Sequence, residues 1–203
     1  MGSFYTNIAL NGPTREDVVA YLRQRQHHTY VSPTIAGITL VYDDFFGEHN
    51  TSAMSVAEEL SRQFQCPTLW AGVADSDVFW YDLYENGVLI DRYVTAPDYD
   101  AGFAEDDENA GTDDQSSEDP ALTAGDAGKL CAAFGAYHAV ETVENLLARE
   151  NSYVFEDDRH AAVAAALGIP AQACTLGYRS IEASDIWTME GEAEGTPLIK
   201  TGD

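Results

Sequence analysis

The densest run of polar residues in the second half of the sequence is EDDRH at residues 156–160. On a helix, Glu156 and His160 lie four residues apart and share one face. A carboxylate and an imidazole at this spacing could act as the acid and base of a hydrolase or transferase centred on Glu156, Asp157 and His160. A charged first turn that complements the helix dipole explains the same residues without chemistry. We favour the structural explanation and keep the enzyme as an alternative hypothesis.

Two other segments carry residue types that bind metals. His27 and His28 are adjacent at the end of a predicted helix, where neighbouring rings diverge and rarely share an ion. The segment from Asp43 to His49 follows a predicted strand and could hold a divalent ion, as many acidic loops could. The sequence contains no glycine-rich phosphate loop and no nucleophile elbow. We therefore predict no metal site and no cofactor.

Aromatic residues crowd one predicted hairpin. Alternation along its first strand puts Trp80 and Tyr84 on one face, and Tyr93 lies on the second strand. One face of the hairpin has to join the core, and the other meets solvent, the C-terminal helices or a partner. Because large aromatic side chains often anchor interfaces, we predict Trp80, Tyr84 and Tyr93 as binding residues. Burial beneath the second half of the chain is the plainer alternative.

The charge of the chain is strongly negative. There are 35 acidic residues against 10 basic ones, which gives a formal net charge of -25. Such a charge makes the compact state repel itself, and salt screens that repulsion. Acidic residues occur in almost every segment, which favours adaptation to a salt-rich cytoplasm over an acidic mimic that inhibits a nucleic-acid enzyme. Direct binding of nucleic acid is not expected, because no basic patch is present to release phosphate counterions.

The sequence predicts a cytoplasmic protein with no membrane contact. No run of about 18 apolar residues occurs, and the N-terminal residues lack the charged and apolar regions of a signal peptide. The three cysteines, Cys66, Cys131 and Cys174, are odd in number and far apart. They are typical of buried thiols in a reducing compartment.

The order of predicted elements is strand, helix, two strands, helix and three strands. Thr14 is placed to cap the first helix, with Asp17 three residues later. Asn86-Gly87 lies between two β-rich runs and predicts a tight hairpin. This layout is typical of a split β-α-β arrangement with an added hairpin. The predicted fold class is α+β, with a largely antiparallel sheet, helices on one face and a helical C-terminal part packed onto it.

The predicted organisation has four parts. Residues 1–97 form the sheet domain, residues 98–126 an acidic flexible loop or linker, residues 127–187 a mainly helical part, and residues 188–203 a tail. A final strand is expected between Cys174 and Ala183, and the last residues are expected to fray. With no recognisable catalytic set, the sequence favours a non-catalytic binding protein that recognises a protein partner.

Overall fold

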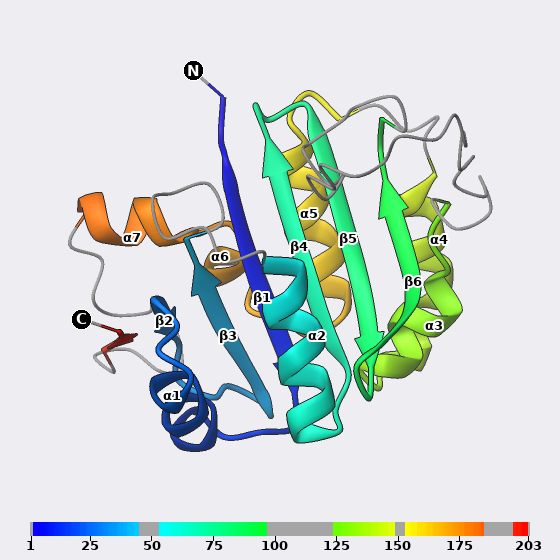
Figure 1. Cartoon of the computed structure of the whole chain (residues 1–203). Coiled ribbons are helices and arrows are strands. Elements are labelled where there is room, and N and C mark those ends of the chain that lie inside the picture. Colours follow the sequence, from blue (N-terminus) through cyan, green and yellow to red (C-terminus); the bar gives the residue numbers. More distant parts are fainter. Residues whose placement is uncertain (1, 45–52, 97–123, 149–152, 185–196, 203) are drawn as a thin grey trace, which may run out of the picture.

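The computed structural model describes residues 2–44, 53–96, 124–148, 153–184 and 197–202. Its centre is one seven-stranded antiparallel sheet with the order β6-β5-β4-β1-β3-β2-β7 (Figure 1). The strands are β1 (Tyr5–Asn11), β2 (Thr29–Val31), β3 (Ile38–Asp43), β4 (Thr68–Ala74), β5 (Val78–Glu85), β6 (Val88–Val94) and β7 (Ile199–Thr201). The inner order β4-β1-β3-β2 is that of a split β-α-β layout, and β5 and β6 extend it. The predicted α+β fold is confirmed.

Helices cover both faces of the sheet. The helices are α1 (Arg15–Gln24), α2 (Ala53–Phe64), α3 (Ala127–Ala133), η1 (Tyr137–Ala139), α4 (Val140–Leu147), α5 (Glu156–Ala166), α6 (Ala171–Cys174) and α7 (Tyr178–Ser184). In Figure 1, α1 and α2 lie in front of the sheet, and the helices of the C-terminal part lie behind it. Among the described helices, none has the length and apolar character needed to cross a bilayer.

Alternation along the strands gives each face its own core. The cluster on the α1/α2 face includes Ile8, Leu10, Val41, Trp70, Trp80 and Tyr84 from the strands and Val18, Leu22, Val56 and Leu60 from the helices. The cluster on the other face includes Tyr5, Tyr42, Phe79, Tyr81 and Tyr93 from the strands and Leu130, Val143, Val163, Leu167 and Ile181 from the helices. Apart from β6 and β7, the strands are therefore almost wholly buried, which leaves little of their length to meet a partner.

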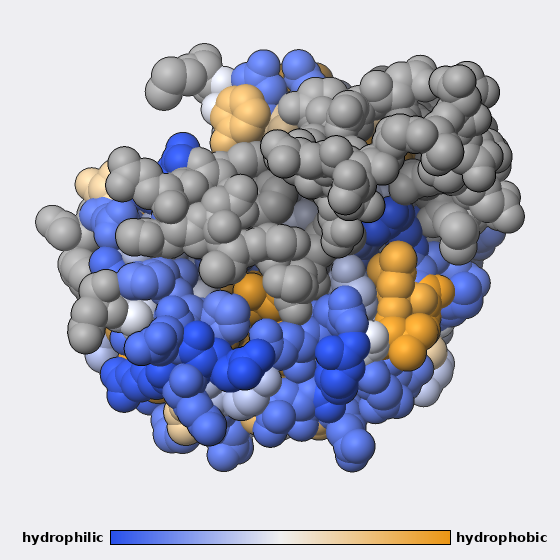
Figure 2. Space-filling model, in the orientation of Figure 1, coloured by the Kyte–Doolittle hydropathy of each residue, from blue (hydrophilic) through white to orange (hydrophobic). Residues whose placement is uncertain are grey.

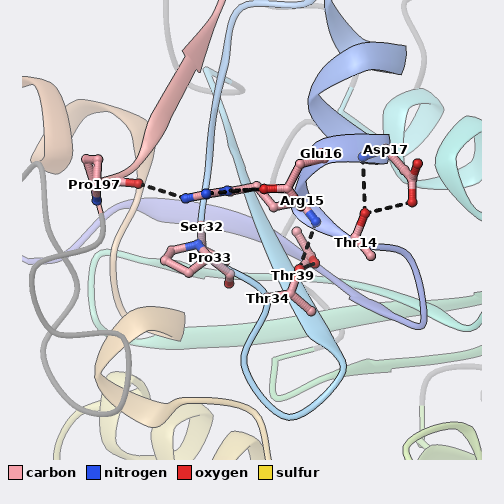
Figure 3. A network of polar contacts seen from close by, with 9 residues as sticks. All are labelled: Thr14, Arg15, Glu16, Asp17, Ser32, Pro33, Thr34, Thr39 and Pro197. Atoms are coloured by element: carbon pink, nitrogen blue, oxygen red, sulfur yellow. Dashed lines mark hydrogen bonds and ion pairs between the residues drawn. The ribbon is translucent and has the colours of Figure 1, made fainter.

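Helix α1 begins where the sequence predicts it. The Thr14 hydroxyl accepts a hydrogen bond from the backbone N–H of Asp17 and donates one to the Asp17 carboxylate (Figure 3). The backbone N–H of Arg15 donates to Thr34 Oγ1 at 2.8 Å, and its guanidinium donates to the Pro197 carbonyl at 3.2 Å. The first turn of α1 is thereby joined to the connection between β2 and β3 and to the segment before β7.

Two tight turns require left-handed backbone. Asn86 (φ 54°) and Gly87 (φ 77°) join β5 to β6, which confirms the predicted hairpin. Asp75 (φ 50°) and Ser76 (φ 58°) join β4 to β5. Serine rarely adopts this conformation, so surrounding contacts have to hold Ser76 in place.

Two predictions for the C-terminal part are wrong. Residues 174–183 form the end of α6 and most of α7 instead of a strand, while residues 199–201 form β7, which pairs with β2 through Thr29 and Thr201. The short strand β2 needs an outer partner, and a segment about 170 residues away supplies it. Such long-range pairing leaves no local sequence pattern. The predicted linker falls largely on residues outside the described part of the chain.

Candidate functional site

Ser76 joins three segments at the end of the sheet where β1 and β5 begin. Its hydroxyl accepts a hydrogen bond from the backbone N–H of Ser3 at 2.8 Å. Its own N–H donates to the Ser3 carbonyl, and its carbonyl accepts from the Glu156 N–H at 2.8 Å. These bonds explain how the left-handed Ser76 is held. They also bring the start of β1 beside the start of α5.

Three exposed apolar residues lie on these joined segments. They are Phe4, Val154 and Phe155, which are 52%, 84% and 55% exposed. Phe4 follows Ser3 and Phe155 precedes Glu156, so both flank residues bonded to Ser76. Exposed acidic side chains at Asp75 and Asp77, on either side of Ser76, form a negative rim. We call the three residues the apolar patch below.

A buried ion pair fixes the α5 side of the apolar patch. Arg159, which is 2% exposed, donates from Nε to the Glu156 carboxylate at 2.7 Å and from Nη1 to the Leu146 carbonyl at 2.6 Å. Its guanidinium also lies over the Tyr153 ring, 4.7 Å from the centroid. Burial raises the pKa of Glu156, and the neighbouring guanidinium counters that rise. The backbone around Val154 is thus held on both sides.

His160 belongs to the core and not to an open site. Its ring is 3% exposed and stacks between Tyr5 and Phe79, with centroid separations of 5.7 and 5.0 Å. The Tyr5 hydroxyl lies 3.1 Å from Nδ1. Burial lowers the pKa of His160 to about 4, so the ring is neutral at neutral pH. Glu156 and Arg159 form a buried ion pair and His160 packs in the core, so most of the polar run at residues 156–160 has a structural role.

Asp157, the third residue of the alternative enzyme, points one oxygen into the protein. Its Oδ2 is buried and has no hydrogen-bond partner. Burial raises the pKa of Tyr5 and lowers the pKa of His160; the negative charge of Asp157 adds to the first shift and opposes the second, so Asp157 lies close to both rings. The three residues therefore gather at one sheet end, but Glu156 and His160 are enclosed by other side chains.

The aromatic residues predicted to bind a partner are all buried. Trp80 and Tyr84 lie on the face covered by α2, where Trp80 meets Trp70 edge-on at 6.1 Å between ring centroids. Tyr93 lies on the opposite face and stacks on Tyr81 at 5.6 Å. Helices cover both sides of the hairpin, so neither of its faces exposes these three aromatic residues. The three positions lend no support to the predicted binding role.

The edge strand β6 shows a second exposed apolar area. Figure 2 shows a hydrophobic strip over this strand on an otherwise mostly hydrophilic described surface. Val88 and Leu89 are the exposed apolar residues there. The Gly125 N–H donates to the Arg92 carbonyl at 3.1 Å, and Lys129 Nζ donates to the Ile90 carbonyl at 3.0 Å. Part of the outer edge of β6 is therefore already occupied.

A cleft of about 560 Å³ lies between β6, α3 and α4. Its buried acid is Asp91, which accepts hydrogen bonds from the Tyr81 hydroxyl at 2.8 Å and the Asp126 N–H at 2.9 Å. Burial raises the pKa of Asp91, while these bonds counter the rise. Because both donors belong to the protein, Asp91 acts here as a structural acceptor that fixes the start of α3.

Sequence reasoning missed the apolar patch. No motif or periodicity in the sequence singles out Phe4, Val154 or Phe155. Neighbouring apolar residues in a short link carry no periodicity that could reveal exposure. Long-range contacts, among them the bonds of Ser76 to Ser3 and Glu156, bring the segments that carry Phe4 and Phe155 to the same end of the sheet.

Within the residues that the structure describes, no group of three or more His, Cys, Asp or Glu side chains is placed to hold a metal ion. The three cysteines are buried free thiols, as the sequence predicts, and burial raises the pKa of Cys174 to about 12. Comparison of the chain with protein-family models, curated proteins and solved structures found no match to any of them.

Proposed function

We propose that this chain is a non-catalytic interaction protein that binds a protein partner through the apolar patch. The observation that carries the proposal is the joint exposure of Phe4, Val154 and Phe155 at one end of the sheet. Burying a Val or Phe side chain in an interface contributes roughly 1.5–3 kcal/mol. Three such residues on neighbouring segments supply the kind of apolar centre from which tight interfaces are built.

The patch is fixed before any partner arrives. Ser76 bonds to Ser3 and to Glu156, and the buried Arg159 lies against Tyr153. A surface that is already ordered loses less conformational entropy on binding. Because these segments are already ordered, we expect them to recognise a folded or extended partner and not to serve as a passive loop.

The charge around the patch indicates a basic partner. Asp75 and Asp77 are exposed beside Ser76, Asp158 is exposed on α5, and the whole chain carries a net charge of -25. Complementary charges speed association and reject acidic competitors. In a salt-rich cytoplasm that steering is screened, and burial of the apolar patch then supplies most of the affinity.

A peptide-display experiment tests the proposal. The full chain is immobilised and exposed to a random peptide library, and the enriched peptides are synthesised for affinity measurement. We expect apolar or aromatic residues flanked by Lys or Arg to be enriched. The double variant Val154→Ser/Phe155→Ser is expected to weaken their binding by roughly tenfold or more, since one decade corresponds to about 1.4 kcal/mol.

The matched control is Val88→Ser/Leu89→Ser, which removes two exposed apolar residues from β6. This control should bind the selected peptides like the unmodified protein. Equal binding by the patch variant, or loss of binding in the β6 variant alone, would contradict the proposal. Loss of binding in the β6 variant alone would mean that the peptides bind at the edge of the sheet.

A further inference from the structure

The cleft between β6, α3 and α4 has the size and the lining of a site for a small organic molecule. Its volume of about 560 Å³ lies within the range of about 300–1,000 Å³ that such sites occupy. Apolar side chains line it from β6 at Ile90 and from α4 at Val140 and Leu147, and Gly125 and Gly128 add no side chain that would fill it. These elements lie together at one edge of the sheet (Figure 1).

The buried carboxylate of Asp91 uses only one of its two oxygens within the fold. The residue is 6% exposed, and both of its hydrogen bonds, from the Tyr81 hydroxyl and the Asp126 N–H, are made to Oδ2. In the described part of the chain, no donor bonds to the other oxygen, Oδ1. Because Asp91 lines the cleft, Oδ1 is the atom available to a ligand there. A carboxylate oxygen this far from bulk water is stabilised by a donor that the ligand supplies.

The charges around the cleft favour a cation over an anion. Asp126 and Glu144 are exposed acids in its lining, whereas Lys129 is the basic residue among the described residues there. The Lys129 ammonium already donates to the Ile90 carbonyl at 3.0 Å and lies 3.9 Å from the Asp126 carboxylate. Three carboxylates against one ammonium leave the lining negative, so a phosphate or carboxylate ligand would be repelled.

The surroundings of Asp91 also bear on its ionisation. Burial raises its pKa, whereas the hydrogen bonds from the Asp126 N–H and the Tyr81 hydroxyl and the charge of Lys129 lower it. A cation placed at Oδ1 would stabilise the ionised carboxylate further. The attraction is stronger in a partly enclosed cleft than in water, because the effective dielectric constant is lower there.

We propose that this cleft binds a small organic amine, whose protonated nitrogen donates to Asp91 Oδ1 and whose apolar body lies against Ile90, Val140 and Leu147. Ammonium–carboxylate hydrogen bonds have lengths of about 2.7–2.9 Å and are among the strong ones in proteins. Glu144 adds a negative charge at the exposed side of the cleft, which attracts the ligand as it approaches. The cleft shares no residue with the apolar patch, so the proposal does not depend on the proposed interaction.

Nuclear magnetic resonance of the full chain tests the ligand class, with phenethylamine as the probe. Phenethyl alcohol has the same apolar body without the charge, and methylammonium has the charge without the body. The titrations are made in about 0.5 M KCl, because a chain with a charge of -25 attracts any cation in dilute buffer. We expect saturable shifts of the backbone amides of Gly125, Gly128 and Lys129, with phenethylamine bound about tenfold or more tightly than either reference.

Three results would overturn this assignment of the ligand. Equal binding of methylammonium would mean that only charge is recognised, and shifts confined to residues outside the cleft would place the amine elsewhere. A lysine blocked at its α-amino and carboxyl groups is the third probe. Tighter binding of this probe than of phenethylamine would assign the cleft to the lysine side chain of a partner protein.

Variants of the lining acids locate the ammonium group. Asp91→Asn should weaken phenethylamine binding by about tenfold or more, while its amide oxygen can still accept the bonds from Tyr81 and Asp126. Unchanged binding by a folded Asp91→Asn variant overturns the proposal. If this variant does not fold, Glu144→Gln tests the cleft from an exposed position and should weaken binding by about twofold to fivefold.

The matched control is Glu141→Gln, which removes an exposed acid from the same helix outside the lining of the cleft. This variant should bind phenethylamine like the unmodified chain. Equal weakening by Glu141→Gln and Glu144→Gln would show that only the overall charge of the chain matters, and would overturn the proposal.

Discussion

The hydroxyl of Tyr5 lies 3.1 Å from Nδ1 of His160, and their rings stack with centroids 5.7 Å apart. This contact joins the first strand to a helix 155 residues later in the chain. Phe79 covers the other side of the imidazole at 5.0 Å. The C-terminal helical part is therefore attached to the sheet through a histidine that has to remain neutral.

We expect His160 to make the fold sensitive to acid. The imidazole titrates near 6.5 when the chain is unfolded, whereas burial lowers its pKa to about 4 in the fold. Between these values the unfolded state binds more protons, so the free energy of unfolding falls as the pH drops from about 6.5 to about 4. The loss should be about 3 kcal/mol and complete below the lower pKa. Urea unfolding across this range measures it.

Carboxylates also titrate in this range, so the comparison has to be made between two proteins. His160→Gln cannot bind the proton and should show a flatter dependence than the unmodified chain. Parallel curves for the two proteins would mean that His160 is not buried as a neutral ring.

The ion pair of Glu156 with Arg159 gives a second prediction. Arg159→Met should lower the free energy of unfolding by about 3–5 kcal/mol, because it leaves the Glu156 carboxylate buried without its partner. Adding Glu156→Gln to this variant should recover part of the lost free energy of unfolding. The control is Arg62→Met, which breaks an exposed pair with Glu58 on α2 and should cost about 0.5 kcal/mol or less. Similar urea midpoints for the two arginine variants would contradict the burial of Arg159.

Gly72 makes room for Trp80. A Cβ added at Gly72 would lie 2.5 Å from Cζ2 of Trp80 and 2.9 Å from the Tyr5 carbonyl oxygen, which is part of the backbone. Gly72→Ala should therefore destabilise the fold by about 1–3 kcal/mol or more through overpacking. The calorimetric Tm should fall, and the near-ultraviolet circular dichroism of the indole should change.

Gly135→Ala separates packing from backbone strain. Gly135 has a φ of 69°, but nothing lies within 4 Å of an added Cβ. Its alanine variant should cost only about 1 kcal/mol. If both alanine variants lose the same stability and leave the indole signal unchanged, the close approach of Trp80 to Gly72 is not the cause.

Local signals identified most of the N-terminal fold. The cap at Thr14 and the Asn86-Gly87 turn depend on side chains and φ angles within a few residues, so the sequence reveals them directly. The pairing of β7 with β2 and the burial of Trp80 under α2 depend on segments far apart in the chain. The same reason explains why the binding prediction fell on buried aromatic residues.

The remaining prediction concerns salt. We propose that the net charge of -25 adapts the chain to a salt-rich cytoplasm, and repulsion between the carboxylates should then weaken the fold in dilute buffer. The Debye length falls from about 10 Å at 0.1 M to about 3 Å at 1 M, so KCl should raise Tm steeply over this range. Circular dichroism during thermal unfolding measures the effect. Sucrose is the uncharged control, because it stabilises by exclusion without screening charge.

The two outcomes assign different meanings to the acidic surface. A steep response to KCl that sucrose does not reproduce would make the charge environmental, and partner recognition would then depend on burial of the apolar patch. A chain that is fully folded and equally stable at low salt would remove the environmental explanation. The exposed acids beside Ser76 would then have to be retained for a basic partner, and binding of the selected peptides should weaken as salt is added.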